Sequence, residues 1–140
     1  MTERTLAIVK PDGVAAGQVG KVLARIESEG LKLVALRLVR LSRAEAEGFY
    51  AVHRQRPFFG ALTAFMSSGP AVAMVLEGDG AIARWREIMG ATDPAKAAAG
   101  TLRRELAANI ERNVVHGSDA PETSLVEIAY FFRGMEILPD

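Results

Sequence analysis

Short, nearly continuous apolar runs occur at three places in the chain and predict buried strands. The runs cover residues 6–9, 31–41 and 71–76, and turn-forming or capping residues follow each of them. We expect a turn after the first run, because residues 11–13 are Pro-Asp-Gly. Two further residues with strand propensity, Val114-Val115, predict a short fourth strand.

Apolar positions three and four residues apart predict helices between these runs. The clearest example is Val19, Val22, Leu23 and Ile26, followed by Gly30 as a C-terminal stop. The same spacing predicts four more helices: from a Ser42 capping box to Arg56, around Leu62 to Met66, from an Asp79 cap to Gly90, and after Asp119. The predicted buried side of the last helix consists of Leu125, Ile128, Ala129 and Phe132.

This order of elements predicts one α+β domain over residues 1–140. The simplest match is a ferredoxin-like βαββαβ sandwich, in which helices pack on a four-stranded antiparallel sheet. Residues 91–112 show little periodicity outside 102–106, and a long irregular connection in a compact domain is usually functional. Because this fold hosts RNA-binding modules as well as enzymes, it does not identify the activity by itself.

Composition excludes several classes of function. Seventeen basic residues balance seventeen acidic ones, so no global field attracts nucleic acid or an acidic membrane. The chain has no cysteine, which excludes a disulfide framework, a thiol nucleophile and a Cys-type zinc site, and its two histidines lack metal-ligand spacing. No run approaches the roughly 20 apolar residues of a membrane span, so we expect a cytoplasmic protein.

Residues 113–119, Asn-Val-Val-His-Gly-Ser-Asp, are the strongest candidate for chemistry. The pattern predicts a strand that ends at His116, a glycine that removes bulk beside the ring, and a helix capped by Ser118 or Asp119. The imidazole would then face the positive end of a helix, where phosphate is a natural ligand. The alternative is a strand-end histidine that only hydrogen-bonds a turn.

Cationic side chains are available to bind such a phosphate. Lys10 follows the first predicted strand, and Arg86 and Arg103 flank the long connection, with Thr92 between them. Two arginines across a loop could clamp phosphate oxygens bidentately. Each of these cations also has a simpler interpretation as solvated surface charge.

Three other side chains have both a structural and a functional interpretation. Glu127 lies nearly opposite the predicted buried stripe of its helix, which favours a solvated carboxylate. Alternatively, it returns to His116 and fixes the tautomer of the ring. Tyr50 fits the edge of the core better than a catalytic acid, whereas Phe58, in a helix break, could stack on a nucleotide base.

Six short motifs occur in order along the chain: Val9-Lys10-Pro11-Asp12-Gly13, Arg56-Pro57-Phe58-Phe59, Ser68-Gly69-Pro70, Gly90-Ala91-Thr92-Asp93-Pro94, Gly100-Thr101-Leu102-Arg103 and Asn113-Val114-Val115-His116-Gly117-Ser118-Asp119. Together they resemble the nucleoside diphosphate kinase family, from the first predicted strand to the last predicted helix. The resemblance implies an enzyme that moves the γ-phosphoryl group of a nucleoside triphosphate to a nucleoside diphosphate, in a ping-pong exchange through a phosphohistidine at His116.

The resemblance also implies roles for individual residues. Ser118 and Glu127 would hold the imidazole, while Phe58 and Ile110 would contact the two faces of the base. The residues expected around the phosphates and the sugar are Lys10, Tyr50, Arg86, Thr92, Arg103, Asn113 and Gly117. Mg²⁺ is expected to arrive on the nucleotide phosphates rather than in a protein cage.

Two features bear on variation within the family. The chain has Arg104-Glu105-Leu106 where a small residue, an acid and a phenylalanine are frequent, which changes the packing beneath Arg103. The resemblance implies a homo-oligomer built from symmetric dimers. Because the chain stops at Asp140, without the tail that in longer members reaches a neighbouring subunit, a tetramer is favoured over a hexamer.

Two other classes of function compete with this interpretation. A nucleic-acid-binding or regulatory module would keep the fold without turnover, but the balanced charge and the nine aromatic residues argue against it. A purely structural oligomerising domain would leave Lys10, Arg86, Arg103 and His116 together without a purpose.

Overall fold

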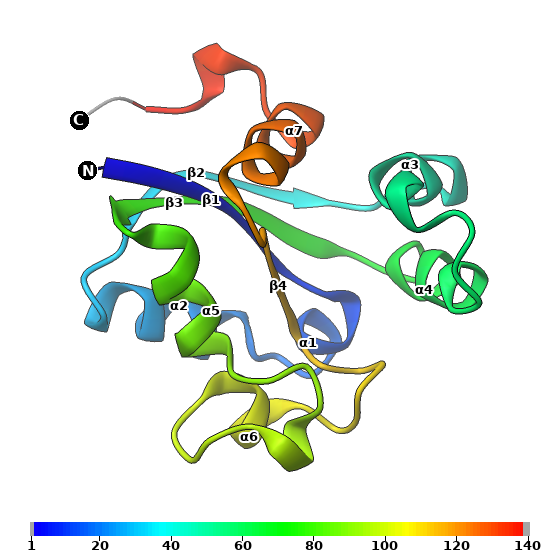
Figure 1. The fold of residues 1–140 in the computed structure, drawn as a ribbon, viewed down its shortest axis with the longest axis horizontal. Coiled ribbons are helices and arrows are strands. Elements are labelled where there is room, and N and C mark those ends of the chain that lie inside the picture. Colours follow the sequence, from blue (N-terminus) through cyan, green and yellow to red (C-terminus); the bar gives the residue numbers. More distant parts are fainter. Residues whose placement is uncertain (1, 139–140) are drawn as a thin grey trace.

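The computed structural model describes residues 2–138, in which four strands form one antiparallel sheet (Figure 1). The strands are β1 (Thr2–Val9), β2 (Lys32–Val39), β3 (Ala71–Asp79) and β4 (Val115–Gly117). Their order is β2-β3-β1-β4, so the first and third strands are central. The predicted α+β fold with a four-stranded antiparallel sheet is confirmed.

Seven α-helices and three short 3-10 helices lie between and after these strands within residues 2–138. The α-helices are α1 (Pro11–Ala15), α2 (Val19–Ser28), α3 (Arg43–Phe49), α4 (Phe59–Met66), α5 (Ala81–Met89), α6 (Leu102–Leu106) and α7 (Pro121–Phe131). The 3-10 helices are η1 (Ala51–His53), η2 (Pro94–Lys96) and η3 (Gly134–Glu136). In Figure 1, α2 and α5 lie on one side of the sheet and α7 on the other, with α3 and α4 paired at one end.

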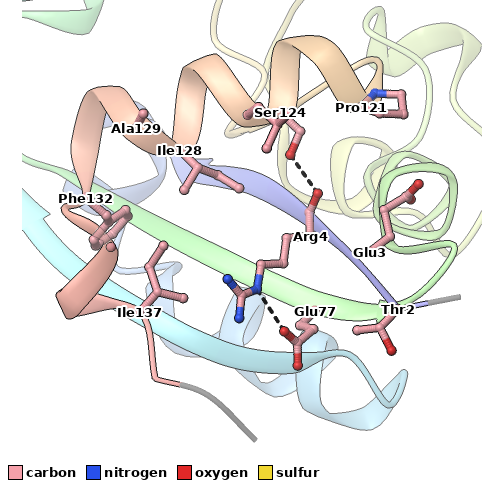
Figure 2. A pocket seen from close by; sticks show the side chains of 12 residues that line it. Thr2, Glu3, Arg4, Glu77, Pro121, Ser124, Ile128, Ala129, Phe132 and Ile137 are labelled. Atoms are coloured by element: carbon pink, nitrogen blue, oxygen red, sulfur yellow. Dashed lines mark hydrogen bonds and ion pairs between the residues drawn. The ribbon is translucent and has the colours of Figure 1, made fainter.

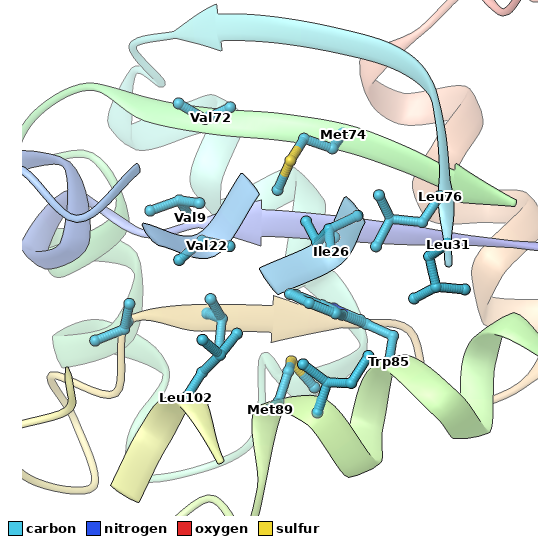
Figure 3. Close-up of a cluster of buried hydrophobic side chains, with 14 of the residues drawn as sticks. Val9, Val22, Ile26, Leu31, Val72, Met74, Leu76, Trp85, Met89 and Leu102 are labelled. Carbon is cyan, nitrogen blue, oxygen red and sulfur yellow. The ribbon is translucent and has the colours of Figure 1, made fainter. Parts of the chain in front are cut away.

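The alternation of side chains along β1 separates two layers of core. Ala7 and Val9 point to one face, where they pack with Val22 of α2, Trp85 of α5 and their neighbours (Figure 3). Leu6 and Ile8 point to the other face and join a cluster that α3, α4 and α7 complete. The sheet is therefore covered on both faces, as a continuous apolar strand requires.

Pairing with β1 fixes what β4 presents to each layer. His116 lies opposite Ile8, and Gly117 lies opposite Ala7. Because directly paired residues point to the same face, the imidazole faces the layer of α3 and α7, whereas Gly117 faces α5.

Local signals that depend on near neighbours were predicted correctly. Ser42 and Glu45 form the capping box at the start of α3, with reciprocal bonds of 3.0 and 2.8 Å. Gly30 and Gly90 follow α2 and α5 with positive φ values of 78° and 86°, as the predicted helix ends require.

Several expectations about helix starts and faces were wrong. Residues 11–13 form the first turn of α1 rather than an isolated turn, since Pro11 occupies a position that needs no N–H donor. Asp79 does not cap α5, because β3 extends through it and Gly80, at φ 62°, makes the turn. Leu125 of α7 is 73% exposed.

The buried face of α7 is rotated from the predicted one. Ser124, Ile128 and Phe131 are its buried residues, and Ala129 is exposed; Phe132 is buried just beyond the helix. The hydroxyl of Ser124 donates to the Arg4 carbonyl at 2.6 Å, which allows a polar residue to face the sheet.

Candidate active site

A carboxylate on α7 holds His116 by one ring nitrogen. Nε2 lies 3.0 Å from Glu127 Oε1, and the Ser118 hydroxyl donates to the same oxygen at 2.7 Å. Ser118 Oγ also accepts the N–H of Leu6 at 3.2 Å, so the serine is itself fixed to β1. An Nε2–H that donates to Glu127 leaves the lone pair on Nδ1, the nitrogen that can act as nucleophile.

The helix after the histidine begins later than predicted. Neither Ser118 nor Asp119 is its N-cap, because α7 starts at Pro121. The imidazole contacts this helix at Glu127, in its middle, rather than at its first turn. Positive charge for an anion beside His116 must therefore come from side chains.

Aromatic rings form one wall of the histidine site. The ring centroids of Phe49 and Tyr50 lie 5.5 and 6.4 Å from that of His116, both edge-on. Tyr50 is buried, and its hydroxyl has no hydrogen-bond partner within residues 2–138. Burial, with the Glu127 charge, raises the pKa of Tyr50, so the phenol stays neutral and can donate a hydrogen bond.

Lys10 is a buried cation at the end of β1. Its Nζ donates to Asn113 Oδ1 at 2.8 Å. Burial first, then repulsion from Arg103, lowers the pKa of Lys10 to about 8, and Asp12 opposes that shift. An ammonium in this environment gains strongly from a phosphate beside it.

Arg103 is a second buried cation, and backbone carbonyls hold it in place. Its guanidinium donates to the carbonyl oxygens of Asn113 at 3.3 Å, Gly90 at 3.1 Å and Val115 at 2.7 Å. Burial, followed by the charge of Arg86, lowers the pKa of Arg103 to about 10. The two arginines predicted to act together are thus close enough for their charges to interact.

These cations are not neutralised by ion pairs. Within residues 2–138, the ion pairs involve none of Lys10, Arg86 and Arg103. A group of buried or clustered cations without carboxylate partners is a site for an anion.

Glycine at 117 serves a different purpose from the predicted one. A Cβ there would lie 2.5 Å from Trp85 Cδ1 and 2.9 Å from Met89 Cε, so Gly117 makes room for α5 rather than for the imidazole. The indole N–H of Trp85 also donates to the His116 carbonyl at 3.1 Å. This helix therefore supports β4 from the face opposite Glu127.

Side chains expected to contact the base are exposed. Phe58 is 48% exposed, whereas its neighbour Phe59 is partly buried in the core. Ile110 is 57% exposed, and its carbonyl accepts from Asn113 Nδ2 at 3.1 Å. Arg112 lies 5.7 Å over the Phe65 ring and brings this segment against α4.

The remaining predicted residues occupy the long connection and its start. Arg86 and Thr92 are exposed, one on α5 and the other in the connection. Beneath Arg103, Leu106 packs on the core. Arg104 donates to the Ala95 carbonyl at 3.3 Å. Arg104, one of the residues that differ from the common family pattern, therefore links two parts of the long connection.

Sequence reasoning missed three contacts of the site: the Phe49 ring beside the imidazole, the Trp85 bond to the His116 carbonyl, and a bond of 3.0 Å from the Val114 N–H to Asp12 Oδ2. Phe49 and Asp12 were visible in predicted elements, but no local signal shows which distant residue each one meets. Val114 is not part of a strand, since its φ is 71° and β4 begins at Val115.

Two grooves lie apart from His116. One, of about 630 Å³, runs between α7, β1, the end of β3 and the segment after α7 (Figure 2). Its lining combines apolar side chains with Thr2, Glu3, Arg4, Glu77 and Ser124, and contains none of the predicted site residues. The other, of about 800 Å³, includes Ile110 and Arg104. Within residues 2–138, no three His, Cys, Asp or Glu side chains cluster to hold a metal ion, and no helix is both long and apolar enough to cross a membrane.

Comparisons with known proteins identify the family. The family profile described as "Nucleoside diphosphate kinase" matches residues 3–137. A nucleoside diphosphate kinase of Desulfosudis oleivorans is 62% identical over 136 residues, covering 97% of this chain and 98% of the relative. One from an Anaeromyxobacter species is 64% identical over 130 residues, covering 93% and 89%.

Solved structures of nucleoside diphosphate kinases share the fold of this chain. The nucleoside diphosphate kinase of Aquifex aeolicus superposes with a TM-score of 0.96 at 47% identity, covering 99% of this chain and all of the other. The Halobacterium salinarum enzyme in complex with CDP gives 0.96 at 41% identity, covering 100% and 93%. With its profile, its close relatives and its fold in agreement, this chain belongs to the nucleoside diphosphate kinase family.

Proposed function

We propose that this chain transfers the γ-phosphoryl group between nucleoside triphosphates and diphosphates through a phosphohistidine at His116. Nδ1 attacks the γ-phosphorus, the bond from phosphorus to the β,γ-bridging oxygen breaks, and the nucleoside diphosphate leaves with that electron pair. A second nucleoside diphosphate then attacks the phosphohistidine, and Nδ1 recovers its lone pair. No proton has to leave the ring, because Nδ1 is already unprotonated when Nε2–H donates to Glu127.

Stabilisation of charge is assigned to the cations. Phosphoryl transfer depends on positioning and on positive charge around the equatorial oxygens. Lys10, Arg103 and Arg86 supply that charge, and Arg103 is preorganised because three carbonyls hold its guanidinium. The Tyr50 hydroxyl, buried and neutral, is a further donor, and Thr92 and Asn113 complete the proposed set around the phosphates and the sugar.

Mg²⁺ enters this proposal as part of the nucleotide substrate. Mg²⁺ prefers a set of oxygen ligands and keeps several waters when it binds through phosphates. The side chains around the proposed phosphate site are cationic or neutral, apart from Asp12 and the Glu127 that binds the histidine, which fits a metal carried by phosphate oxygens.

The proposed base contacts are apolar and predict broad specificity. Phe58 and Ile110 would contact the faces of the base, and stacking is tolerant because every base has a π-face. We expect purine and pyrimidine nucleotides, with ribose or deoxyribose, to be accepted. Parallel lines in double-reciprocal plots agree with the proposal, whereas intersecting lines or a many-hundredfold preference for one base contradict it. A cytoplasmic location is proposed on family membership alone.

The observation that carries the proposal is the hydrogen bond between His116 Nε2 and Glu127, whose carboxylate also accepts a hydrogen bond from Ser118. The protein is incubated with γ-labelled ATP and then with GDP or dTDP. We expect acid-labile label on the protein and its discharge by either diphosphate. His116→Ala should carry no label while nucleotide binding stays measurable, and His53→Ala, which removes the other histidine, should still be labelled. Turnover by His116→Ala would refute the mechanism.

A further inference from the structure

An unusual turn precedes the histidine. Val114 is the one non-glycine residue with positive φ within residues 2–138, at 71°, and the Val115 N–H donates back to the Asn113 carbonyl at 2.8 Å. A three-residue turn with positive φ at its centre is rare and strained, most of all for a β-branched residue. Such a conformation persists only where its surroundings impose it.

The segment after β1 holds both backbone polar groups of Val114. Asp12 Oδ2 accepts its N–H at 3.0 Å, and the Lys10 N–H donates to its carbonyl at 2.7 Å. Gly13 lies against its side chain, because a Cβ there would be 3.0 Å from Val114 Cγ1 and 2.8 Å from Val9 Cγ1. The side chain that binds the Val114 N–H is that of Asp12, and Asp12 has no other role in the proposed chemistry.

The residues on either side of this turn bind the cations of the site. Asn113 accepts Lys10 Nζ on its side chain at 2.8 Å and Arg103 Nε on its carbonyl at 3.3 Å. The Val115 carbonyl accepts Arg103 Nη2 at 2.7 Å. A different turn at Val114 would therefore move both buried cations.

The negative charge of Asp12 also acts on Lys10. The charged groups that act on the Lys10 ammonium are Asp12 from α1 and Arg103 from α6, and Arg86 of α5 lies next to Arg103. Asp12 raises the pKa of Lys10 against burial and Arg103. Its second oxygen, Oδ1, is buried and accepts no hydrogen bond from the described residues.

We infer that Asp12 is a positioning residue that clamps the turn at Val114 and acts by its negative charge on the phosphate-binding lysine that this turn holds in place. This inference rests on the proposed function, in which Lys10 and Arg103 bind the transferred phosphate. Asp12 itself touches neither the nucleotide nor His116 in this account.

Two substitutions separate the clamp from the charge. Asp12→Ala removes both, whereas Asp12→Asn keeps an oxygen that can accept the Val114 N–H and loses only the charge. Glu27→Gln, on the exposed side of α2, is the matched control for loss of one carboxylate. Hydrogen exchange of the Val114 amide in the nucleotide-free protein reports the turn, and the rate of phosphoenzyme formation from about pH 6 to pH 9 reports the site.

For Asp12→Ala we expect faster exchange at Val114 and a loss of about 10- to 100-fold in phosphoenzyme formation at every pH, as for a misplaced catalytic group. Asp12→Asn should keep Val114 protected and approach the wild-type rate near pH 6. It should lose activity at a lower pH than the wild type, because Lys10 without Asp12 gives up its proton sooner. Glu27→Gln should match the wild type.

Unchanged exchange at Val114 in Asp12→Ala, or a pH profile of Asp12→Asn that superposes on the wild-type profile, overturns the inference. If Asp12→Ala does not fold, Val114 exchange and the pH profile of Asp12→Asn decide. If the wild-type protein forms no phosphoenzyme, the proposed function fails, while exchange at Val114 still tests the clamp.

Discussion

At the scale of residues, the site separates the groups that orient His116 from the groups that bind charge. Glu127 and Ser118 hold one edge of the ring, on the layer of α7. Lys10 and Arg103 are buried near the start of β4 and are held by Asn113 and by carbonyls. Each group can therefore be altered by itself.

Removing the carboxylate that orients the ring should slow chemistry more than binding. In Glu127→Ala the Nε2–H loses its acceptor, so the ring is free to change tautomer and rotate. We expect phosphoenzyme formation to slow by about 10- to 100-fold. Glu122→Ala, an exposed position on the same helix, is the control. Stopped-flow or quench measurement of the labelled protein gives both rates, and equal rates for the two variants would rule out an orienting role for Glu127.

The pKa of Lys10 predicts how activity depends on pH. A lysine with its pKa lowered to about 8 is charged below that pH and loses its charge as the pH rises through it. Because the charged form binds phosphate, kcat/KM should fall above about pH 8. The raised pKa of Tyr50 and the value of about 10 for Arg103 leave Lys10 to account for this limb. Lys10→Gln should have a low kcat/KM at every pH, without the decrease above about pH 8. A decrease that persists in this variant would belong to another group.

At the scale of elements, the sequence predicts what depends on near neighbours. The Ser42 capping box and the Val22 and Ile26 stripe were correct because their partners lie within one or two helical turns. The turn at Val114 could not be predicted, since valine disfavours positive φ and the carboxylate that holds it lies 102 residues earlier. The contact between His116 and Glu127 remained one of two alternatives until the rotation of α7 was known.

The packing of β4 against α5 gives a prediction for stability. Gly117→Ala places a Cβ within 2.5 Å of Trp85, and Trp85 is fully buried and cannot move aside freely. We expect a loss of about 1–3 kcal/mol in the free energy of unfolding. Gly20→Ala in α2, where a Cβ meets nothing within 4 Å, should instead stabilise by about 0.5–1 kcal/mol. Chemical denaturation of both variants is the measurement, and a Gly117→Ala protein as stable as the wild type would contradict the packing.

At the scale of the whole molecule, the sheet has an exposed apolar edge. β2 is an outer strand, and its Leu36 and Leu38 are 49% and 69% exposed. Natural proteins rarely leave such an edge uncovered. The homo-oligomer expected from the sequence, with a tetramer favoured over a hexamer, stays a prediction that this edge makes physically reasonable.

Light scattering at micromolar concentration tests assembly directly. We expect a mass that is a multiple of the 15.0 kDa of one chain. Leu38→Lys places a charge on the exposed edge and should shift the protein toward smaller species if β2 lies in an interface. A wild-type mass of one chain would contradict oligomerisation, and a mass of six chains would overturn only the preference for a tetramer.

The position of the phosphate on the imidazole distinguishes this mechanism from its alternatives. Glu127 occupies Nε2, so Nδ1 should carry the phosphoryl group. Protein labelled with ¹⁵N in histidine is phosphorylated with ATP and observed by nitrogen and phosphorus NMR. A single phosphohistidine substituted at Nδ1 of His116 is the predicted result, and a phosphate on Nε2, or on any other residue, would contradict the account.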